Sequence, residues 1–200
     1  MAEEKKSLGN IIFFVVLAAL VAGAFAFRSY WSNTYGGVVV DGHSMDKTLY
    51  DGEKLLMRYA KKGASAKRGD IIVVDVSAYE ECADMSSQYL IKRLIAVEGD
   101  KVKCTDGQIE ICYAGTTEYQ VLEEPYAYYT NAEAYDFGEY VVGEDEVFFL
   151  GDNRNNSCDS RYNQPSGSHL SYLYKETDIY GIVPDWALEH QNILEIILFR

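Results

Sequence analysis

The sequence is poor in positive charge, with 18 Lys and Arg against 31 Asp and Glu, and its formal net charge is −13. A nucleic-acid-binding protein needs clustered basic side chains for the phosphates, so this balance argues against nucleic acid as a partner. The 3 prolines and 16 glycines are too few for a collagen-like or low-complexity chain. No repeat with a period of roughly 20 to 50 residues is present, which argues against a repeat array.

Metal-binding patterns are also missing. The four cysteines, Cys82, Cys104, Cys112 and Cys158, form no CxxC or Cys/His pattern typical of zinc, and the sequence implies no metal and no other cofactor. Four cysteines allow three complete disulfide connectivities, and the sequence does not choose among them. The dipeptide Asp106-Gly107 predicts a two-residue hairpin turn that places Cys104 opposite Ile109. That hairpin therefore does not by itself bring Cys104 and Cys112 together.

One long apolar run is present, at residues 11–27, and it carries no charge. A helix of this length covers roughly 25 Å, against about 30 Å for the hydrocarbon core of a bilayer, and uncharged neighbours extend it. Tyr30 and Trp31 suit the aromatic belt at the water interface. We therefore predict a single transmembrane anchor over residues 11–31, with the lipid bilayer as a partner.

The charges around the run predict its orientation. Lys5 and Lys6 precede it, and only Arg28 follows closely. Because cytoplasmic flanks carry the excess of basic residues, we expect residues 1–10 in the cytoplasm and residues 32–200 outside it, in the cell membrane of the producing cell.

A cleaved secretory signal is the competing interpretation of the same run. It would use the small-x-small site Ala24-Phe25-Ala26, after a basic start and an apolar middle. Hydropathy alone does not separate the two interpretations. Both of them place residues 28–200 outside the cytoplasm.

The remainder of the chain indicates an all-β domain of mainly antiparallel sheets. With 48% apolar residues a packed core is expected, and no long amphipathic helix follows the anchor. Residues 114–145 are acidic and rich in tyrosine, and we predict that they form an insertion or small subdomain. Aromatic and β-branched runs between turn residues predict strands at 37–41, 54–59, 71–76, 89–97, 101–104, 108–113, 146–150 and 193–199.

Three segments carry residues suited to chemistry. Ser44 lies in a Gly-His-Ser-Met turn after a strand, Lys92 lies within a strand, and residues 151–161 form a polar loop of turn formers. Strand alternation places Lys92 on the same face as Leu90 and Leu94. If that face is buried, the lysine loses proton affinity and can act as a base, whereas an edge-strand lysine would keep its charge in water. Taken singly, each segment is also compatible with a purely structural role.

Taken together, these segments resemble the signature motifs of the type I signal peptidases, membrane-anchored serine peptidases that remove secretory signal peptides. The order and spacing of the motifs match, and an apolar anchor precedes the nucleophile motif. The resemblance covers most of residues 11–161 and a short segment near the end. It is carried by Ser44-Met45-x-x-Thr48-Leu49, by Arg68-Gly69-Asp70-Ile71-Ile72-Val73-Val74, by Lys92-Arg93-x-Ile95 with Gly99-Asp100, by GDNRNNSCDSR at 151–161 and by Asp178-Ile179-Tyr180-Gly181.

The resemblance implies a nucleophile at Ser44 and a general base at Lys92. It further implies that Ser157 hydrogen-bonds and orients Lys92. Ionic pairs are implied between Asp152 and Arg93 and between Asp159 and Arg161. The Ser44 N–H is expected to bind the oxyanion. Some family members add a hydroxyl two residues before the nucleophile; Gly42 stands there in this chain and leaves the second donor open.

The substrates implied by the resemblance are secretory preproteins with small residues at the first and third positions before the cut. Val38, Val40, Leu90 and Ile91 match positions that line the corresponding pockets, and an extended peptide can add beside these strands. We expect a monomeric enzyme. The chain departs from the family at Lys47, where the family usually has Pro, and at Ala96 and Glu98, where it usually has Gly and Pro.

Other functional classes fit the sequence less well. A Ser-His-Asp enzyme would need a suitably placed histidine, but His43 is adjacent to Ser44, and His169 and His190 lie in unrelated contexts. A cysteine peptidase using Cys158 lacks an identifiable base. A catalytically silent binding protein on the same fold would not need Ser44 and Lys92 intact. A self-cleaving repressor with a similar Ser/Lys pair would carry a DNA-binding domain.

Overall fold

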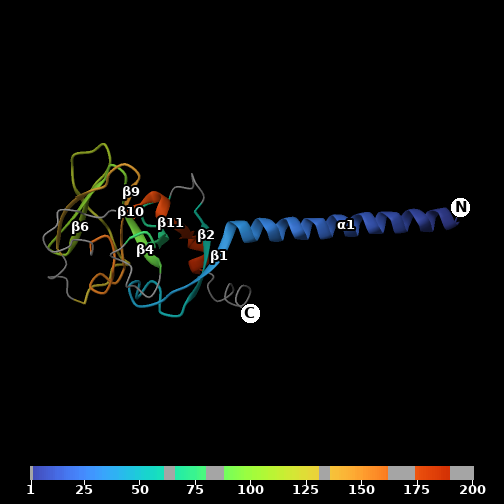
Figure 1. The fold of residues 1–200 in the computed structure, drawn as a ribbon, viewed down its shortest axis with the longest axis horizontal. Helices are drawn as coiled ribbons and strands as arrows, with labels where there is room; N and C mark the ends of the chain where they lie inside the picture. The colour runs from blue at the N-terminus through green and yellow to red at the C-terminus, as the bar shows by residue number, and fades with distance from the viewer. Residues whose placement is uncertain (1, 61–65, 80–87, 131–135, 162–173, 190–200) are drawn as a thin grey trace. The chain divides into compact units, whose positions relative to one another are not determined.

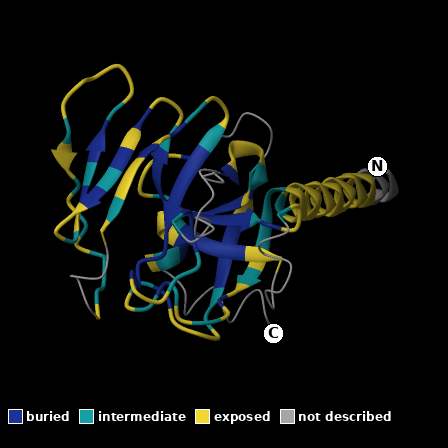
Figure 2. Cartoon of the chain, turned by 60° about the vertical axis from the view of Figure 1, so that its left-hand side comes forward, coloured by how far each residue is buried: buried dark blue, intermediate teal, exposed yellow. Residues whose placement is uncertain are grey.

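The structure is a computed structural model that describes residues 2–60, 66–79, 88–130, 136–161 and 174–189. It forms two compact units, residues 1–36 and 37–200. In the first unit, helix α1 (Ala2–Thr34) contains the predicted anchor, and its Gly9–Thr34 part is long and apolar enough to cross a membrane. No residue of that part is buried by other parts of the protein (Figure 2). This exposure of apolar side chains fits a helix whose surroundings are lipid.

The second unit is built from two antiparallel sheets, which confirms the all-β prediction (Figure 1). The seven-stranded sheet has the order β1-β2-β11-β3-β4-β9-β10, and the four-stranded sheet has the order β7-β6-β5-β8. The first sheet comprises β1 (Tyr35–Val39), β2 (Lys54–Tyr59), β3 (Ile71–Asp75), β4 (Tyr89–Val97), β9 (Glu146–Leu150), β10 (Tyr174–Lys175) and β11 (Ile179–Val183). The second comprises β5 (Lys101–Thr105), β6 (Gln108–Cys112), β7 (Gln120–Val121) and β8 (Phe137–Val141). A 3₁₀ turn (Glu176–Asp178) and helix α2 (Asp185–Glu189) complete the described elements.

The central strands are apolar on both faces because both faces are covered. In β3, Ile72 and Val74 belong to one buried cluster, whereas Ile71 and Val73 belong to another. A third cluster joins β4 and β9 to the four-stranded sheet. The strands around the site are therefore held by packing on two sides, which gives the site a rigid support.

The β5–β6 hairpin forms as its turn dipeptide predicts. Asp106 and Gly107 have φ angles of +52° and +73°, the left-handed conformation that a two-residue turn of this kind needs. Cys104 lies opposite Ile109, as expected. Cys104 and Cys112 form no disulfide within the described residues, and Cys82 lies outside them.

The segment 114–145 contributes two strands to the second sheet. Its β7 pairs with β6 and its β8 pairs with β5, so the segment flanks the hairpin on both sides. The domain boundaries, including an insertion at 114–145, stay a prediction. The predicted strand at 193–199 lies outside the described residues.

Candidate active site

Ser44 lies in a tight turn between β1 and β2. The Thr48 and Leu49 N–H groups both donate to the Met45 carbonyl, at 3.0 and 2.8 Å. Met45 and Leu49 are buried in the apolar cluster beneath the turn. Gly42, whose φ of +91° disfavours other residues, begins the turn. The serine is thereby held on a rigid turn with its side chain directed at β4.

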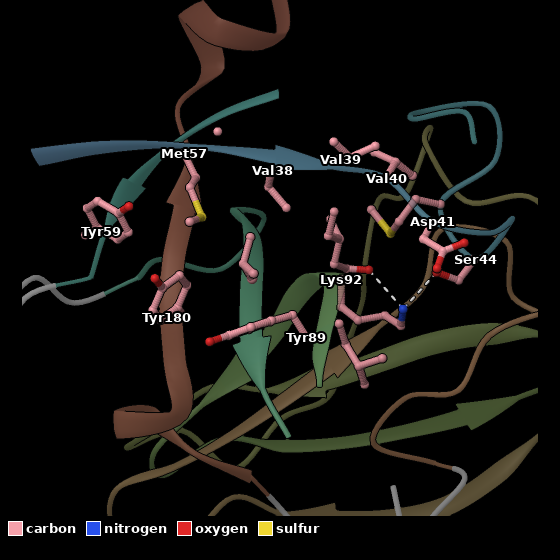
Figure 3. A pocket seen from close by; sticks show the side chains of 15 residues that line it. Val38, Val39, Val40, Asp41, Ser44, Met57, Tyr59, Tyr89, Lys92 and Tyr180 are labelled. Atoms are coloured by element: carbon pink, nitrogen blue, oxygen red, sulfur yellow. Dashed lines mark hydrogen bonds between the residues drawn. The ribbon is translucent and has the colours of Figure 1, made fainter. Parts of the chain in front are cut away.

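Lys92 lies in the middle of β4 and is only 3% exposed. Its cross-strand neighbour is Ile72, which packs in one cluster with Leu90 and Leu94, so the predicted apolar face is buried. The Lys92 Nζ donates to Ser44 Oγ at 2.8 Å and to the Ile91 carbonyl at 2.9 Å (Figure 3). The sheet and the turn thus bring together the two residues proposed from the sequence.

Burial lowers the pKa of Lys92 from its ordinary value of 10.5 to about 8. The cause is loss of hydration of the ammonium ion, which favours the neutral amine. The negative charge of Asp159, and to a smaller degree Cys158 and Asp152, opposes this effect. A neutral amine is therefore accessible near physiological pH, as a proton acceptor for Ser44 requires.

The loop after β9 is fixed by the ionic pairs that the family resemblance implied. Arg93 donates from Nε and Nη2 to the two oxygens of Asp152, at 2.9 and 2.6 Å. Asp152 also accepts the Thr48 hydroxyl at 2.6 Å, which ties the nucleophile turn to the same carboxylate. Arg161 binds Asp159 in the same bidentate manner, with both distances 2.8 Å. Such two-point pairs define orientation as well as contact.

Ser157 does not make its expected hydrogen bond to Lys92. Its Oγ is buried and has no hydrogen-bond partner among the described residues. The side chain instead packs against Gly151, where it occupies the space of a β-carbon. The Lys92 Nζ donates to Ser44 Oγ and to the Ile91 carbonyl.

A cavity of about 450 Å³ extends from Ser44 and Lys92 between β1 and β4. Its lining includes all four predicted pocket residues: Val38, Val40, Leu90 and Ile91. Three residues that the sequence reasoning missed, Tyr59, Tyr89 and Tyr180, line the end away from the dyad (Figure 3). Their rings pack at 4.9 to 5.5 Å between centroids. The tyrosines lie on three strands, so no local sequence pattern could group them.

Sequence reasoning also missed a buried ion pair behind the loop. Arg154 donates from Nη1 and Nη2 to the carboxylate oxygens of Glu124, at 2.9 and 2.5 Å, and from Nε to the Gly151 carbonyl at 3.0 Å. The side chains are 0% and 7% exposed. Tyr126 in the same segment lies over the Arg93 guanidinium at 3.9 Å. The pair could not be found from the sequence, because its partners are thirty residues apart and Glu124 is one of several acidic residues in its segment.

Each residue that departs from the expected family pattern is accommodated by its own backbone conformation or contacts. Lys47 adopts a φ of +75°, which a proline cannot reach, and its Nζ lies 3.8 Å from the centre of the Tyr128 ring. Glu98 accepts the Asp145 N–H at 3.1 Å, and Ala96 is fully buried. Within the described residues, the hydrogen bonds and ring contacts of Lys47, Ala96 and Glu98 do not involve Ser44 or Lys92.

The alternative chemistries gain no support from the described residues. The His43 imidazole pairs with Asp46 at 3.3 Å rather than with Ser44, and it is largely exposed. His169 and His190 lie outside the described residues. Within the described ranges, no group of three or more His, Cys, Asp or Glu side chains is arranged to hold a metal ion.

Comparisons with known proteins find similarity along most of the chain. A family model described as signal peptidase, peptidase S26, matches residues 6–184. A signal peptidase I of Bacillus licheniformis is 36% identical over 80% of this chain and 84% of its own length. The signal peptidase I P of Bacillus subtilis subsp. natto is 33% identical over 80% of this chain and 81% of its own. A crystal structure of a signal peptidase I from Enterococcus faecalis V583 is 25% identical, with a TM-score of 0.43 over 62% of this chain and 98% of that one.

The family model covers well over half of the chain, and the relatives align along most of their length. The Ser/Lys pair and the ionic loop lie within the matched region. On this evidence the chain belongs to the signal peptidase family, peptidase S26.

Proposed function

We propose that this serine endopeptidase removes N-terminal signal peptides from secreted preproteins, with Ser44 as the nucleophile and Lys92 as the general base. One observation carries the assignment of the two residues. The Lys92 Nζ lies 2.8 Å from the Ser44 Oγ while the lysine is 3% exposed. A buried amine at hydrogen-bond distance is suited to take a hydroxyl proton.

The proposed reaction proceeds through an acyl-enzyme. Neutral Lys92 takes the Ser44 proton as Oγ attacks the scissile carbonyl carbon, and the carbonyl electrons move to oxygen. The lysine then protonates the leaving amine as the tetrahedral intermediate collapses to an ester. Water, deprotonated by Lys92, then attacks this ester. The bond from the acyl carbon to Ser44 Oγ breaks, Oγ takes the proton back from Lys92, and the signal peptide leaves with a new carboxylate. The Ser44 N–H stabilises the oxyanion in both halves of the reaction.

We propose supporting roles for the ionic residues around the dyad. Asp152 joins β4, through Arg93, to the nucleophile turn, through Thr48. Asp159 accepts the Gly151 N–H at 3.0 Å while it is paired with Arg161. These contacts hold the loop against both reacting groups, which keeps the attack geometry within narrow limits.

The substrate segment before the cut is proposed to bind in the cavity as an extended strand. β1 is an edge strand of the sheet formed by the described residues, so a peptide can pair with its outer edge. Val38 and Val40 of β1 and Leu90 and Ile91 of β4 line the cavity with apolar side chains. The resemblance to the signal peptidases supports small residues at the first and third positions before the cut.

Helix α1 is proposed to anchor the enzyme with its N-terminus in the cytoplasm. The apolar length of Gly9–Thr34 supports a membrane span, and the basic residues before it support the orientation. A protease added outside spheroplasts of an expressing bacterium should degrade the domain at 32–200. Protection of this domain until the membrane is lysed would contradict the orientation.

The cleavage reaction is tested with the full-length chain in detergent and a purified preprotein whose first and third positions before the cut are alanine. Mass spectrometry should show a single cut at that site. Ser44→Ala should give no product, and a preprotein with tryptophan at the first position should remain intact. Cleavage by Ser44→Ala at the wild-type rate would overturn the assignment of the nucleophile.

A further inference from the structure

The peptide group between His43 and Ser44 has a special position in the site. Its N–H belongs to Ser44 and is the proposed donor to the oxyanion, and its carbonyl belongs to His43. Among the residues that the structure describes, no group accepts the Ser44 N–H. Gly42, two residues earlier, has no side chain that could add a hydroxyl donor. Stabilisation of the oxyanion therefore depends strongly on how this one peptide group is oriented and polarised.

Asn153 contacts this peptide group from the loop after β9. Its side-chain Nδ2 donates to the His43 carbonyl oxygen at 2.9 Å. Its backbone N–H donates to the next carbonyl, that of Ser44, at 3.0 Å. Asn153 is only 4% exposed, and the amide contacts the backbone around the nucleophile rather than its hydroxyl.

Asn153 is itself held firmly. It forms a bridge with Tyr128, whose N–H donates to the Asp152 carbonyl at 2.7 Å and whose carbonyl accepts the Arg154 N–H at 2.9 Å. The Asn156 N–H donates to the Asn153 carbonyl at 3.1 Å. The amide is thus placed on a braced segment of backbone, which allows it to fix the orientation of its partner.

We infer that Asn153 is a positioning residue that orients and polarises the oxyanion donor of Ser44. A hydrogen bond to the carbonyl of a peptide group strengthens the N–H of the same group as a donor, because hydrogen bonds in a chain polarise one another. The bond from Asn153 also prevents the peptide plane from rotating away from the cavity. This inference rests on the proposed function, because it assigns a role within the same reaction.

The test compares Asn153→Ala and Asn153→Asp in the full-length chain in detergent. We expect kcat of Asn153→Ala to fall roughly ten-fold to a hundred-fold with KM unchanged, less than the roughly hundred- to thousand-fold typical when a donor is removed. Asn153→Asp has nearly the same shape but cannot donate when ionised, and its carboxylate repels the His43 carbonyl. Its kcat should be lower still. Both variants keep the backbone bond to Ser44.

A second readout separates positioning of the donor from general loosening of the loop. In a substrate-like peptide aldehyde, Ser44 Oγ adds to the aldehyde carbon, its proton passes to Lys92, and the aldehyde oxygen becomes the oxyanion. The matching peptide alcohol binds without this step. Asn153→Ala should weaken aldehyde binding roughly ten-fold or more and leave alcohol binding unchanged. The ratio of the aldehyde affinity to the alcohol affinity is a property of the folded enzyme, so partial unfolding of the variant does not alter it.

Asn155→Ala is the matched control. The Asn155 Oδ1 fixes the same loop by accepting the N–H and hydroxyl of Thr130, at 2.9 and 3.2 Å. Equal losses of kcat in Asn153→Ala and Asn155→Ala, or equal losses of aldehyde and alcohol binding, would overturn the inference while the wild type still cleaves. An inactive wild type would instead overturn the proposed function itself.

Discussion

The Nζ of Lys92 lies 2.8 Å from the Oγ of Ser44, although 48 residues separate the two along the chain. Three contacts account for this proximity. The nucleophile turn is anchored below by buried Met45, and Thr48 binds the carboxylate that also holds Arg93, the neighbour of Lys92 on β4. The pair is therefore positioned by buried and ionic contacts outside the reacting groups.

The pH dependence of cleavage should follow the protonation of Lys92. Only the neutral amine can accept the Ser44 proton, so kcat/KM should rise about ten-fold per pH unit below the lysine pKa and level off above about 8. At pH 7 roughly one molecule in ten would be active, against about one in three thousand for a lysine of ordinary pKa. The measurement is kcat/KM between pH 6 and about 10 with a neutral peptide substrate.

Substitution of the lysine checks the same point. Lys92→Arg keeps the charge but stays protonated over this range, and it should be inactive. Lys92→His should fail as well, because the shorter imidazole does not reach Ser44 from β4. Circular dichroism establishes that the variants are folded. A flat wild-type profile, or a folded Lys92→Arg with most of the activity, would leave Lys92 as a structural cation.

The strands could be predicted from the sequence more completely than the site. β2, β4 and β9 have the predicted bounds, because their apolar and β-branched residues lie between turn residues that stop each strand. The Asp106-Gly107 turn was predictable from its dipeptide, since few residues tolerate positive φ. Such features depend on neighbours along the chain.

The site could not be predicted from neighbouring residues in the sequence, because it depends on packing between distant segments. Alternation could place Lys92 on one face with Leu90, but whether that face is buried depends on how β3, β9 and β11 pack around it. The assignment of Lys92 came from the resemblance to a family. The expected bond from Ser157 to Lys92 was wrong because side-chain direction in a loop is set by packing, here against Gly151. The contacts of Asn153 and Arg154 had no sequence signal.

Lys47 should not tolerate replacement by proline, the residue that the family resemblance leads us to expect at this position. Proline fixes φ near −65°, whereas Lys47 has a φ of +75°. Lys47→Pro should destabilise the domain by more than about 1 kcal/mol and reduce cleavage, because the nucleophile turn must change its backbone. Lys47→Gly is the control, and its stability should be close to that of the wild type. Glycine adopts the positive φ without strain, which stabilises the domain by about 1 kcal/mol. Loss of the Lys47 contact with the Tyr128 ring costs about as much.

Urea unfolding in detergent measures both Lys47 variants. A Lys47→Pro variant as stable and as active as Lys47→Gly would show that the left-handed backbone at this position is dispensable.

Removing one partner of the Arg154–Glu124 ion pair should lower the free energy of unfolding more than removing both partners. Arg154→Met leaves the Glu124 carboxylate, whose side chain is 7% exposed, without its ionic partner, and should cost about 3–5 kcal/mol. The double variant Arg154→Met with Glu124→Leu removes both charges and should recover a large part of that loss. The free energies of unfolding of the wild type, Arg154→Met, Glu124→Leu and the double variant form a complete cycle. Additive losses would indicate that the two charges stabilise the fold independently.

Gly151 should be required for space rather than for backbone conformation. A β-carbon there would lie 2.5 Å from the Ser44 carbonyl oxygen and would overlap the Ser157 side chain. The backbone at Gly151 does not lie in the left-handed region, so the clash alone opposes a substitution. Gly151→Ala must displace the nucleophile turn, and a shift of about 1 Å can cost roughly a hundred-fold in rate.

Two further variants separate the clashes that Gly151→Ala creates. Adding Ser157→Gly removes both Ser157 atoms that the new β-carbon would overlap, the hydroxyl and the β-carbon, but leaves the contact with the Ser44 carbonyl, so kcat should stay low in this double variant. Gly138→Ala is the control, because a β-carbon at Gly138 meets nothing within 4 Å, and its backbone is likewise outside the left-handed region. It should keep wild-type kcat. If the double variant recovers wild-type kcat, Ser157 alone is the obstacle, and the close approach of the loop to the Ser44 backbone does not control the reaction.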